Sequence, residues 1–421
     1  MSVPKLRFPK FSDNWQQSRL GEVFDWIRTN SLSRANLSVD EGIVQNIHYG
    51  DIHSKFQALF DQSRERIPYI KDTEVTAALK DEEFCRAGDL VIADASEDYA
   101  DIGKAIEIVN VNPKSLVAGL HTYIARPKNG KTALGFSGWQ FVSPNMRKQI
   151  MRIAQGISVL GISKTNLSEI TTYFPSLPEQ KKIADFLGAV DEKLHLLLVR
   201  HEQLTLYKKG VMQKIFTQTI RFKADDGSNF PDWESKPLGD VLYETRKRNY
   251  DLEYDKSQVL SVSGEKGIVN QIGHLGRSYA GASVDNYHVV EVGDVVYTKS
   301  PLKLNPYGII KVNKKKAGIV STLYAVYRPF DPRSGDYIDH YFSIDDNLNK
   351  YLRPLVRKGA KNDMKINNAY VLSDPISIPC LAEQQKIADF LSTLDDKISA
   401  VSAQVDQMQA FKKGLLQQMF V

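Results

Sequence analysis

Two long stretches of the chain place apolar side chains at alternating intervals of four and three residues. The positions in the first stretch are Ile183, Leu187, Val190, Leu194, Leu197, His201, Leu204, Lys208, Val211 and Ile215. The positions in the second stretch are Ile387, Leu391, Leu394, Ile398, Val401, Val405, Met408, Lys412, Leu415 and Met419. Only His201, Lys208 and Lys412 interrupt the apolar series. This spacing, kept over about five heptads, predicts two long helices with coiled-coil seams.

The two stretches are copies of one another. Glu179-Gln-Lys-Lys-Ile-Ala-Asp-Phe-Leu187 returns as Glu383-Gln-Gln-Lys-Ile-Ala-Asp-Phe-Leu391. The match continues without a gap to Tyr207-Lys-Lys-Gly210 in the first copy and Phe411-Lys-Lys-Gly414 in the second. The chain therefore contains an internal repeat.

A second, weaker repeat opens each half of the chain. Trp15, followed by Leu20-Gly-Glu-Val23, reappears as Trp233, followed by Leu238-Gly-Asp-Val241. The distance from this repeat to the helical repeat differs between the two halves. The halves share their ends and differ in the inserts between them, which indicates a scaffold that presents two different surfaces.

Each predicted helix has an apolar seam that it cannot bury alone, and the other copy is the obvious partner. A helix of about 39 residues is about 58 Å long. Because a long globular segment separates the helices in the sequence, we expect them to run antiparallel. The residues predicted to pair are Ile183, Leu187, Val190, Leu194, Ile387, Leu391, Leu394 and Ile398. The alternative is that each helix packs on its neighbouring globular unit.

Short β-type runs occur in both inserts, bounded by Gly, Pro and Asn: Leu90–Ala93, Ala105–Val109, Asp294–Tyr297 and Leu323–Tyr327. Gly88-Asp89 and Gly293-Asp294 precede corresponding strands, so we expect the inserts to share a fold. The predicted fold is mixed α/β, with two globular domains joined by two long helices in an antiparallel coiled coil and an internal pseudo-twofold repeat. The predicted boundaries are 1–175 for the first globular domain, 176–217 for the first helix, 218–379 for a linker with the second domain, and 380–421 for the second helix.

Composition narrows the class of protein. A chain of 421 residues suits two globular units, and 42% hydrophobic with 25% charged residues is ordinary for a soluble protein. No apolar run reaches the ~20 residues that span a bilayer, and the N-terminus lacks the apolar segment of a signal peptide. The distant pair Cys85 and Cys380 favours a reducing, cytoplasmic location without disulfides. The net charge of +5 permits a polyanionic partner but does not demonstrate one.

Several fragments resemble catalytic motifs, but each is incomplete. Asn305-Pro-Tyr307 lacks the second proline of the amino-methyltransferase motif, and no Gly-rich cofactor loop precedes it. Pro231-Asp-Trp-Glu-Ser-Lys236 has the letters of a nuclease PD…ExK site, with its carboxylates too close together in the sequence. A possible metal cluster lacks a fourth clear ligand and a counterpart in the other half: His48, Asp51, His53 and His121. We therefore expect no catalytic residue, metal or cofactor in this chain.

The duplicated Glu-Gln-x-Lys-Ile-Ala-x-Phe-Leu helix and the Leu-Gly-Glu/Asp-Val openings resemble the DNA-specificity subunit of a type I restriction–modification system. The resemblance covers essentially the whole chain. Gly161–Leu167 is also similar to the family's approach to the helix, whereas the second half departs from it at Lys365–Val371. The resemblance implies that the inserts are target-recognition domains, each reading one half of a bipartite, asymmetric double-stranded DNA site.

The same resemblance implies the partners. Two methyltransferase (modification) subunits would dock on the helices, and two restriction subunits would join the complex for cleavage. S-adenosylmethionine, ATP and Mg²⁺ would be used by those partners and not by this chain. Two alternatives stay open: a standalone DNA-modifying enzyme, against which the missing cofactor loop argues, and a scaffold that does not bind DNA.

Short polar segments of the inserts contain the candidates for DNA contact, because hydroxyl, imidazole and ammonium groups bind base edges and phosphates. The candidates are Tyr49, His53, Lys55, Ser96, His121, Thr122, Lys299, Ser300, Lys303 and Tyr307. Lys299 and Lys303 are the strongest as phosphate ligands. Their acidic neighbours have an alternative role, which is to brace loops: Asp51, Asp94, Glu97 and Asp98.

Overall fold

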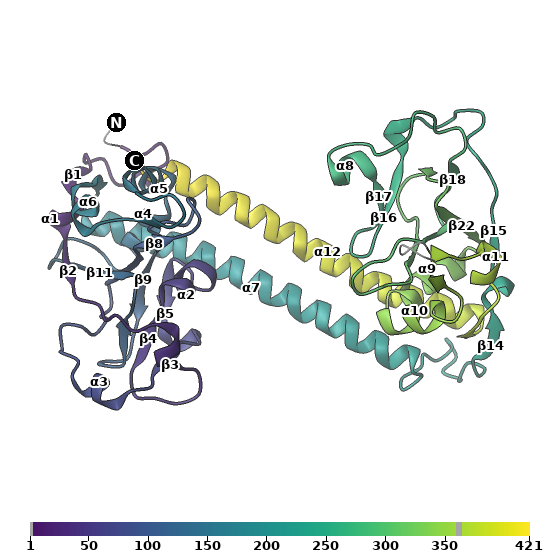
Figure 1. Ribbon diagram of the computed structural model, residues 1–421, viewed down its shortest axis with the longest axis horizontal. Helices are drawn as coiled ribbons and strands as arrows, with labels where there is room; N and C mark the ends of the chain where they lie inside the picture. Colours follow the sequence, from purple (N-terminus) through teal and green to yellow (C-terminus); the bar gives the residue numbers. More distant parts are fainter. Residues whose placement is uncertain (1–2, 359–363) are drawn as a thin grey trace. The chain divides into compact units, whose positions relative to one another are not determined.

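The computed structural model describes residues 3–358 and 364–421, which divide into two units (Figure 1). The first unit comprises Met1–Val199 with Ala403–Val421, and the second comprises Arg200–Ser402. Each unit holds one globular part and portions of two long helices, α7 (Leu177–Phe216) and α12 (Leu381–Gln418). The fold class is the one expected from the sequence, a mixed α/β protein with two globular domains, two long antiparallel helices and an internal repeat.

The core of the first unit is a five-stranded sheet in the order β2–β11–β7–β9–β5. Its central strand, β7 (Leu90–Ala93), is apolar and buried at every position, as expected for a strand covered on both faces. β7 coincides with one predicted strand, and β9 (Ala105–Asn110) contains another. The other strands of this unit are β1 (Gln16–Arg19), β2 (Phe24–Ile27), β3 (Leu37–Ser38), β4 (Gln45–Ile47), β5 (Leu59–Asp61), β6 (Tyr69–Ile70), β8 (Ala95–Ser96), β10 (Leu116–Ala118), β11 (Thr122–Pro127), β12 (Leu160–Gly161) and β13 (Thr171–Phe174).

The second unit repeats this strand order. Its sheet runs β15–β22–β19–β20, which corresponds to β2–β11–β7–β9. β19 (Val295–Thr298) and β22 (Tyr324–Pro329) overlap the two strands predicted there. The other strands are β14 (Glu234–Pro237), β15 (Leu242–Glu244), β16 (Leu260–Ser263), β17 (Gly267–Asn270), β18 (His288–Val290), β20 (Ile309–Val312), β21 (Gly318–Val320), β23 (Arg357–Lys358), β24 (Met364–Lys365) and β25 (Pro375–Ile378).

Short helices surround both sheets. In the first unit they are α1 (Leu20–Val23), α2 (Tyr49–Ser54), α3 (Thr73–Ala77), α4 (Phe136–Val142), α5 (Pro144–Ile153) and α6 (Lys164–Glu169). In the second unit they are α8 (Gln271–Leu275), α9 (Arg333–Phe342), α10 (Asp345–Leu352) and α11 (Asn368–Val371). The 3₁₀ turns are η1 (Arg34–Asn36), η2 (Gln62–Arg64), η3 (Leu238–Asp240) and η4 (Lys256–Gln258).

The same turn leads into the central strand of each sheet. Gly88-Asp89 precedes β7 and Gly293-Asp294 precedes β19, and the two glycines have φ of 92° and 91°, a region that favours glycine. The Asp89 carboxylate accepts hydrogen bonds from Arg126 at 2.9 and 2.8 Å, and the Asp294 carboxylate accepts them from Arg328 at 2.7 and 3.0 Å. These paired contacts confirm the expectation that the two inserts share a fold.

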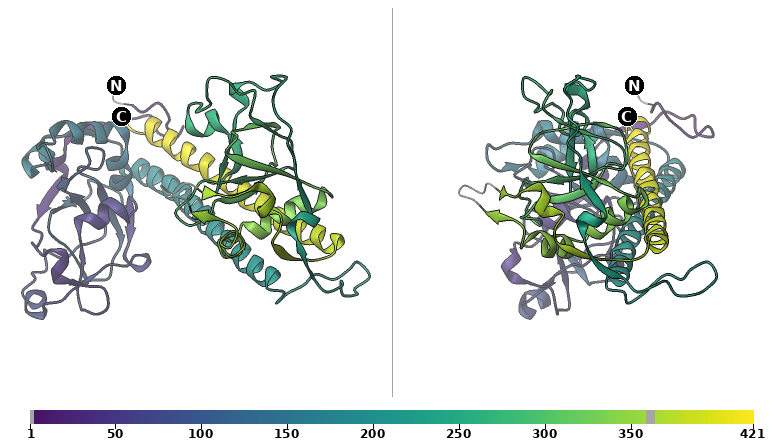
Figure 2. Two further views of the ribbon diagram at one scale, coloured as in Figure 1. Left: turned by 45° about the vertical axis from the view of Figure 1, so that its right-hand side comes forward. Right: turned by 90° about the vertical axis from the view of Figure 1, so that its right-hand side faces the viewer.

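The apolar seams of α7 and α12 are buried or half-buried at all of their predicted positions. In the first unit, Ile183 and Leu187 share a core with Leu415 of α12 and with the globular part. In the second unit, Ile387 and Leu391 of α12 share a core with the end of α7 and the globular part there. Within each unit the portions of the two helices lie side by side (Figures 1 and 2) and pack on the globular part.

The repeated Glu-Gln pair at the start of each long helix has a structural role. The buried carboxylate of Glu179 accepts two hydrogen bonds from Arg7, at 2.7 Å each, and one from Trp15 Nε1 at 3.4 Å. The side chain of the adjacent Gln180 donates to the carbonyl of Pro175 at 3.0 Å. The second copy repeats the carboxylate contacts with Glu383, Arg221 and Trp233.

Candidate nucleic-acid interface

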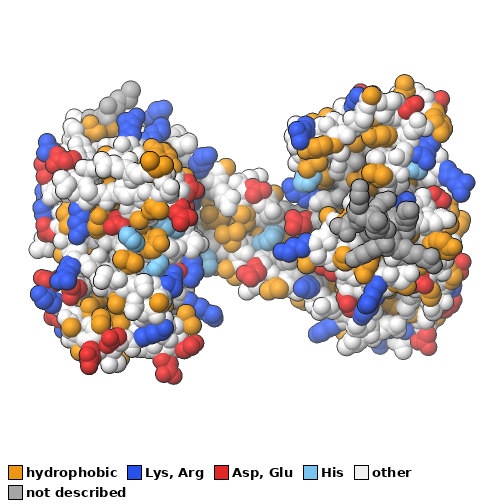
Figure 3. Space-filling model, viewed as in Figure 1, with side chains coloured by type: hydrophobic (Ala, Val, Ile, Leu, Met, Phe, Trp, Pro, Cys, Tyr) orange, Lys and Arg blue, Asp and Glu red, His pale blue; other side chains and the backbone are white. Residues whose placement is uncertain are grey.

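Three of the candidate residues in the first unit lie together. Tyr49 and His53 project from α2, and His121 lies in the turn before β11. The Tyr49 ring meets His53 and His121 edge to face, with centroids 6.0 and 5.4 Å apart. We call these three residues the His–Tyr cluster. His121 is exposed and Tyr49 and His53 are half-buried, so a ligand can reach the cluster. Figure 3 shows histidine side chains at the surface of this unit.

Lys55 lies beside the cluster and is paired with a buried carboxylate. Asp51 contacts Lys55 Nζ at 2.8 Å and Arg34 Nη1 at 2.8 Å. Burial alone would raise the pKa of Asp51, but the hydrogen bonds from Arg34 and Lys55 lower it below its ordinary value. Asp51 therefore braces α2, while Lys55 keeps more than half of its side chain exposed.

Two candidates in the first unit lie inside it. Ser96 and Thr122 are 6% and 2% exposed. The Ser96 hydroxyl donates to the carbonyl of Asp98 at 2.9 Å, and the Thr122 hydroxyl donates to the carbonyl of Gly119. The assignment of these two hydroxyls to the DNA-facing surface is therefore corrected. They hold the loops in which their exposed neighbours lie.

The candidates in the second unit share the loop between β19 and β20. Ser300 and Lys303 are exposed, and Lys299 and Tyr307 are half-buried. Burial lowers the pKa of Lys299, although Glu244 opposes this effect. The carbonyl of Tyr307 accepts a hydrogen bond from the Tyr297 hydroxyl at 2.7 Å, which ties the end of the loop to the sheet.

The candidate loops occupy corresponding places in the two units. The loop after β7 begins with Asp94 and the loop after β19 begins with Lys299, because both strands start at the shared glycine–aspartate turn and have four residues. Sequence reasoning left Asp94 out of the candidates, but its carboxylate lies 3.2 Å from His121 Nδ1. No local signal predicts this contact, because the two residues are far apart in the sequence.

Two of the lysines that line a cleft in the second unit are paired with carboxylates. This cleft, of 640 Å³, is lined by several lysines, including Lys208 and Lys314. Lys208 pairs with Asp395 at 2.5 Å, and Lys314 pairs with Asp336 and Asp339 at 3.1 and 2.9 Å. Lys208 and Lys314 are therefore weaker candidates for phosphate contact than the exposed Lys303.

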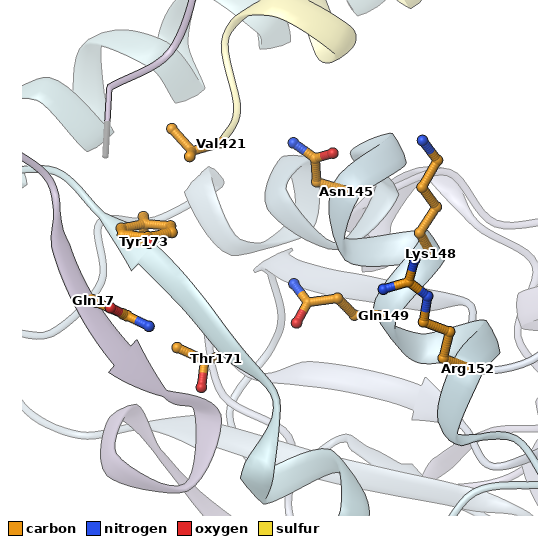
Figure 4. Close-up of a pocket in the computed structure, with 8 residues that line it drawn as sticks. All are labelled: Gln17, Asn145, Lys148, Gln149, Arg152, Thr171, Tyr173 and Val421. Atoms are coloured by element: carbon orange, nitrogen blue, oxygen red, sulfur yellow. The ribbon is translucent and has the colours of Figure 1, made fainter. Parts of the chain in front are cut away.

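The first unit also has a groove of 470 Å³, whose lining residues are drawn in Figure 4. None of these residues belongs to the His–Tyr cluster. It is lined by Gln17, Asn145, Lys148, Gln149, Arg152, Thr171, Tyr173 and Val421. Its side chains come mainly from α5 and from the β1–β13 pair. The groove combines amides and hydroxyls with two cations and contains no candidate from the sequence.

Neither a metal centre nor a membrane segment is found in the described part of the chain. Within residues 3–358 and 364–421, no group of three or more His, Cys, Asp or Glu side chains is arranged to hold a metal. His48 Nδ1, a member of the possible metal cluster, instead accepts from the backbone N–H of Gly50 at 3.1 Å. None of the helices in these ranges is both long and apolar enough to cross a bilayer.

Comparison with known proteins gives consistent matches. The family model of the type I restriction modification DNA specificity domain matches residues 12–206 and again 231–407. A Methanocaldococcus jannaschii protein, named as the specificity subunit of type I restriction enzyme MjaX, is 23% identical over 98% of this chain and 94% of its own length.

Two solved structures have a similar fold. The crystal structure of a type I restriction–modification S subunit from M. genitalium aligns with a TM-score of 0.59 at 13% identity, over 100% of this chain and 99% of that one. A second structure, from work on complex assembly and conformational transition of the type I R-M system, aligns with a TM-score of 0.50 at 15% identity and covers 96% of each chain. At these identities the alignments establish the shared fold.

Proposed function

The chain belongs to the type I restriction–modification DNA-specificity family, and we propose that, as such a specificity subunit, it reads a bipartite, asymmetric DNA site with one half assigned to each globular part. The two inserts would act as target-recognition domains, and the long helices would carry the modification subunits. The chain itself would supply sequence recognition and no catalysis.

One observation supports this proposal most strongly. The two units share the central strand of the sheet and the glycine–aspartate turn before it, but they differ in the loop that follows this strand. The Asp89–Arg126 and Asp294–Arg328 pairs fix equivalent central strands. The loop that follows begins with a carboxylate in one unit and an ammonium group in the other. Different side chains at equivalent places of a repeated fold can bind different bases, since base edges differ in their hydrogen-bond donors and acceptors. The two units are therefore expected to recognise two different half-sites.

Two equivalent exposed aromatic residues support docking of two copies of one partner. Tyr207 on α7 and Phe411 on α12 occupy the same place in the helical repeat and are 54% and 51% exposed. Exposed aromatic side chains are typical anchors of protein interfaces. Because the repeat presents the feature twice, each modification subunit can meet the same surface.

A glycine lies one turn beyond each of these aromatic residues, at Gly210 and Gly414. Glycine inside a helix costs about 1 kcal/mol relative to alanine. The chain's own packing does not require either glycine, since a Cβ at Gly210 would meet nothing within 4 Å and a Cβ at Gly414 would meet only Gln418 Nε2 at 3.8 Å. Residues three apart lie on the same face of a helix, so each aromatic side chain projects next to a glycine that has no side chain. A partner helix can contact the aromatic ring and approach the backbone closely at the glycine.

We further propose that two modification and two restriction subunits complete the complex. S-adenosylmethionine, ATP and Mg²⁺ would be bound by those subunits, and the complex would act in the cytoplasm. A standalone DNA-modifying enzyme and a scaffold without DNA binding are the competing functions. The family of the chain favours neither of them.

The test is to purify the chain with and without its modification subunit and to measure binding to a library of random duplexes. The proposal predicts enrichment of two separated, unlike half-sites by the assembled complex. It also predicts methylation at those sites only when the modification subunit and S-adenosylmethionine are both present. Methylation or cleavage by the chain alone would favour the enzyme alternative, and a complex without sequence preference would favour the scaffold.

A further inference from the structure

We propose that Asp94 and His121 form a base-reading pair in the first unit, and that Lys299 takes the corresponding place in the second. This inference rests on the proposed function, because it names the groups that would distinguish the two half-sites. The first unit would accept a hydrogen bond from an exocyclic amino group of adenine or cytosine. The second would donate to the acceptor edge of guanine.

Strand register establishes the correspondence on the opposite strand. Thr122 of β11 lies opposite the last residue of β7, and Tyr324 of β22 lies opposite the last residue of β19. The residues just before them, His121 and Leu323, therefore occupy matching positions. His121 thus faces Asp94 at the place where Leu323 accompanies Lys299.

Backbone and side chain both hold His121 against Asp94. The N–H of Asp94 donates to the carbonyl of His121 at 3.1 Å, and Asp94 Oδ1 lies 3.2 Å from His121 Nδ1. His121 has φ of 57°, which is uncommon for a residue other than glycine. The Tyr49 ring also packs against the imidazole, with 5.4 Å between centroids and 78° between the ring planes.

This arrangement determines the hydrogen-bonding character of the exposed edge. An ionised carboxylate only accepts hydrogen bonds, so Nδ1 of His121 carries the hydrogen in the contact with Asp94. In the uncharged imidazole tautomer that carries its hydrogen on Nδ1, Nε2 is an acceptor. Half of the His121 side chain is exposed, whereas only 18% of the Asp94 side chain is. The amino groups of adenine and cytosine are the donors that the major groove offers to such an acceptor.

The second unit presents a hydrogen-bond donor, Lys299, at the place where the first presents an acceptor. The Lys299 ammonium group has three donors and no acceptor. In the major groove, guanine O6 and N7 are the acceptors that lysine binds most often. Its neighbour Leu323 is 70% exposed and cannot redirect this donor by hydrogen bonding. Equivalent places in the two units would therefore bind an amino group of a base in one half-site and the acceptor atoms of guanine in the other.

The test measures base preference in the complex with the modification subunit, as methylation rates on duplexes in which each half-site position is varied. The unaltered complex is expected to prefer adenine or cytosine over guanine or thymine by about 5- to 150-fold at one position of one half-site. Asp94→Asn should remove most of this preference at that position alone. An amide both donates and accepts, so it also stabilises the other tautomer, in which Nε2 donates.

His121→Asn is the second variant, because asparagine tolerates positive φ but does not reach as far as imidazole. This variant should also lose the preference for adenine or cytosine. Its base preference in the other half-site should be unchanged, which would show that the protein is folded. Glu97→Gln is the matched control, since it removes one exposed negative charge from the same loop and should change nothing. Lys299→Met should relax a guanine preference in the other half-site only.

The outcomes separate the two proposals. If the unaltered complex has sequence preference and neither Asp94→Asn nor His121→Asn changes it, the base-reading pair is wrong and the proposed function stands. A preference for guanine or thymine at the affected position contradicts the acceptor role of Nε2. A complex without any sequence preference contradicts the proposed function itself.

Discussion

Arg7 binds both oxygens of the Glu179 carboxylate, through Nε and Nη2, at 2.7 Å each. The side chains are 12% and 1% exposed, so the pair is removed from water. This contact fixes the start of α7 to the N-terminal segment of the first unit. Arg221 and Glu383 do the same for α12 in the second unit.

Loss of either carboxylate should destabilise its own unit. Glu179→Ala leaves Arg7 and Trp15 Nε1 without their acceptor, and breaking a buried pair of this kind costs about 3–5 kcal/mol. Glu383→Ala should have a comparable effect on the second unit. Urea unfolding with hydrogen-exchange mass spectrometry measures both effects. Asp185→Ala, which removes an exposed carboxylate from α7, is the control and should cost less than about 1 kcal/mol.

The seam of each long helix should be intolerant of charge. Leu187→Asp and Leu394→Asp place a carboxylate at positions 1% and 5% exposed, which costs several kcal/mol if the site stays dry. Each variant should lower the stability of its own unit and abolish docking of the modification subunits. Leu196→Asp changes a leucine that is 59% exposed on α7, and its unfolding midpoint should stay close to that of the unaltered chain. Soluble, docking-competent Leu187→Asp and Leu394→Asp proteins would disprove helix pairing through these residues.

The exposed aromatic residues should control docking without affecting stability. Tyr207→Ala and Phe411→Ala should each weaken one of two modification-subunit sites by tenfold or more, about 1.4 kcal/mol, and the double variant should bind neither. Gly210→Leu should block the first site by bulk, since the space beside Gly210 within the chain is open. Gly188→Ala, also with open space around it, is the control and should dock normally. Native mass spectrometry of the complexes counts the bound subunits, and two copies on the double variant would contradict this docking surface.

Glu107 in the first unit and two histidines in the second unit should contribute to the pH dependence of stability in opposite directions. In the first unit, burial raises the pKa of Glu107 from 4.5 to about 7, although hydrogen bonds from the N–H groups of Gly138 and Gly135 oppose this. A carboxyl group whose pKa is raised by folding is neutral more readily in the folded state. The first unit should therefore lose stability as pH rises from about 4.5 to 7, by about 3 kcal/mol at most.

In the second unit, burial lowers the pKa of His288 from 6.5 to about 4, and the nearby Arg248 adds to this. Burial also lowers the pKa of His340 to about 4. A histidine whose pKa is lowered by folding resists protonation in the folded state, so this unit should lose stability as pH falls from about 6.5 to 4. Hydrogen exchange at pH 5 and pH 8, corrected for intrinsic rates, resolves the two units. Glu107→Gln should change the profile of the first unit and leave that of the second unit as it is, and an unchanged first profile would contradict the assignment to Glu107.

The sequence predicted the features that depend on local periodicity. Both long helices, the internal repeat and four strands follow from patterns within short windows, and α7 begins and ends within one residue of the predicted helix. The glycine–aspartate turns were also visible, because positive φ restricts the residue type.

Contacts between distant residues were not predictable in this way. The sequence alone does not distinguish a hydroxyl that faces solvent from one that donates to a backbone carbonyl. Ser96 and Thr122 were therefore expected at the surface, whereas both are buried. Asp94 and His121 meet only because β7 and β11 are neighbours in the sheet. The Glu-Gln repeat was recognisable as a motif, but its partners Arg7 and Trp15 lie more than 150 residues away in the sequence.

We propose that each globular part reads its own half of a bipartite DNA site. The most direct measurement is to replace residues 1–175 with the corresponding segment of a relative of different specificity, and to sequence every site that the complex with the modification subunit methylates. One half of the methylated site should change to that of the relative while the other half stays the same. A change in both halves, or in neither, would contradict this proposal.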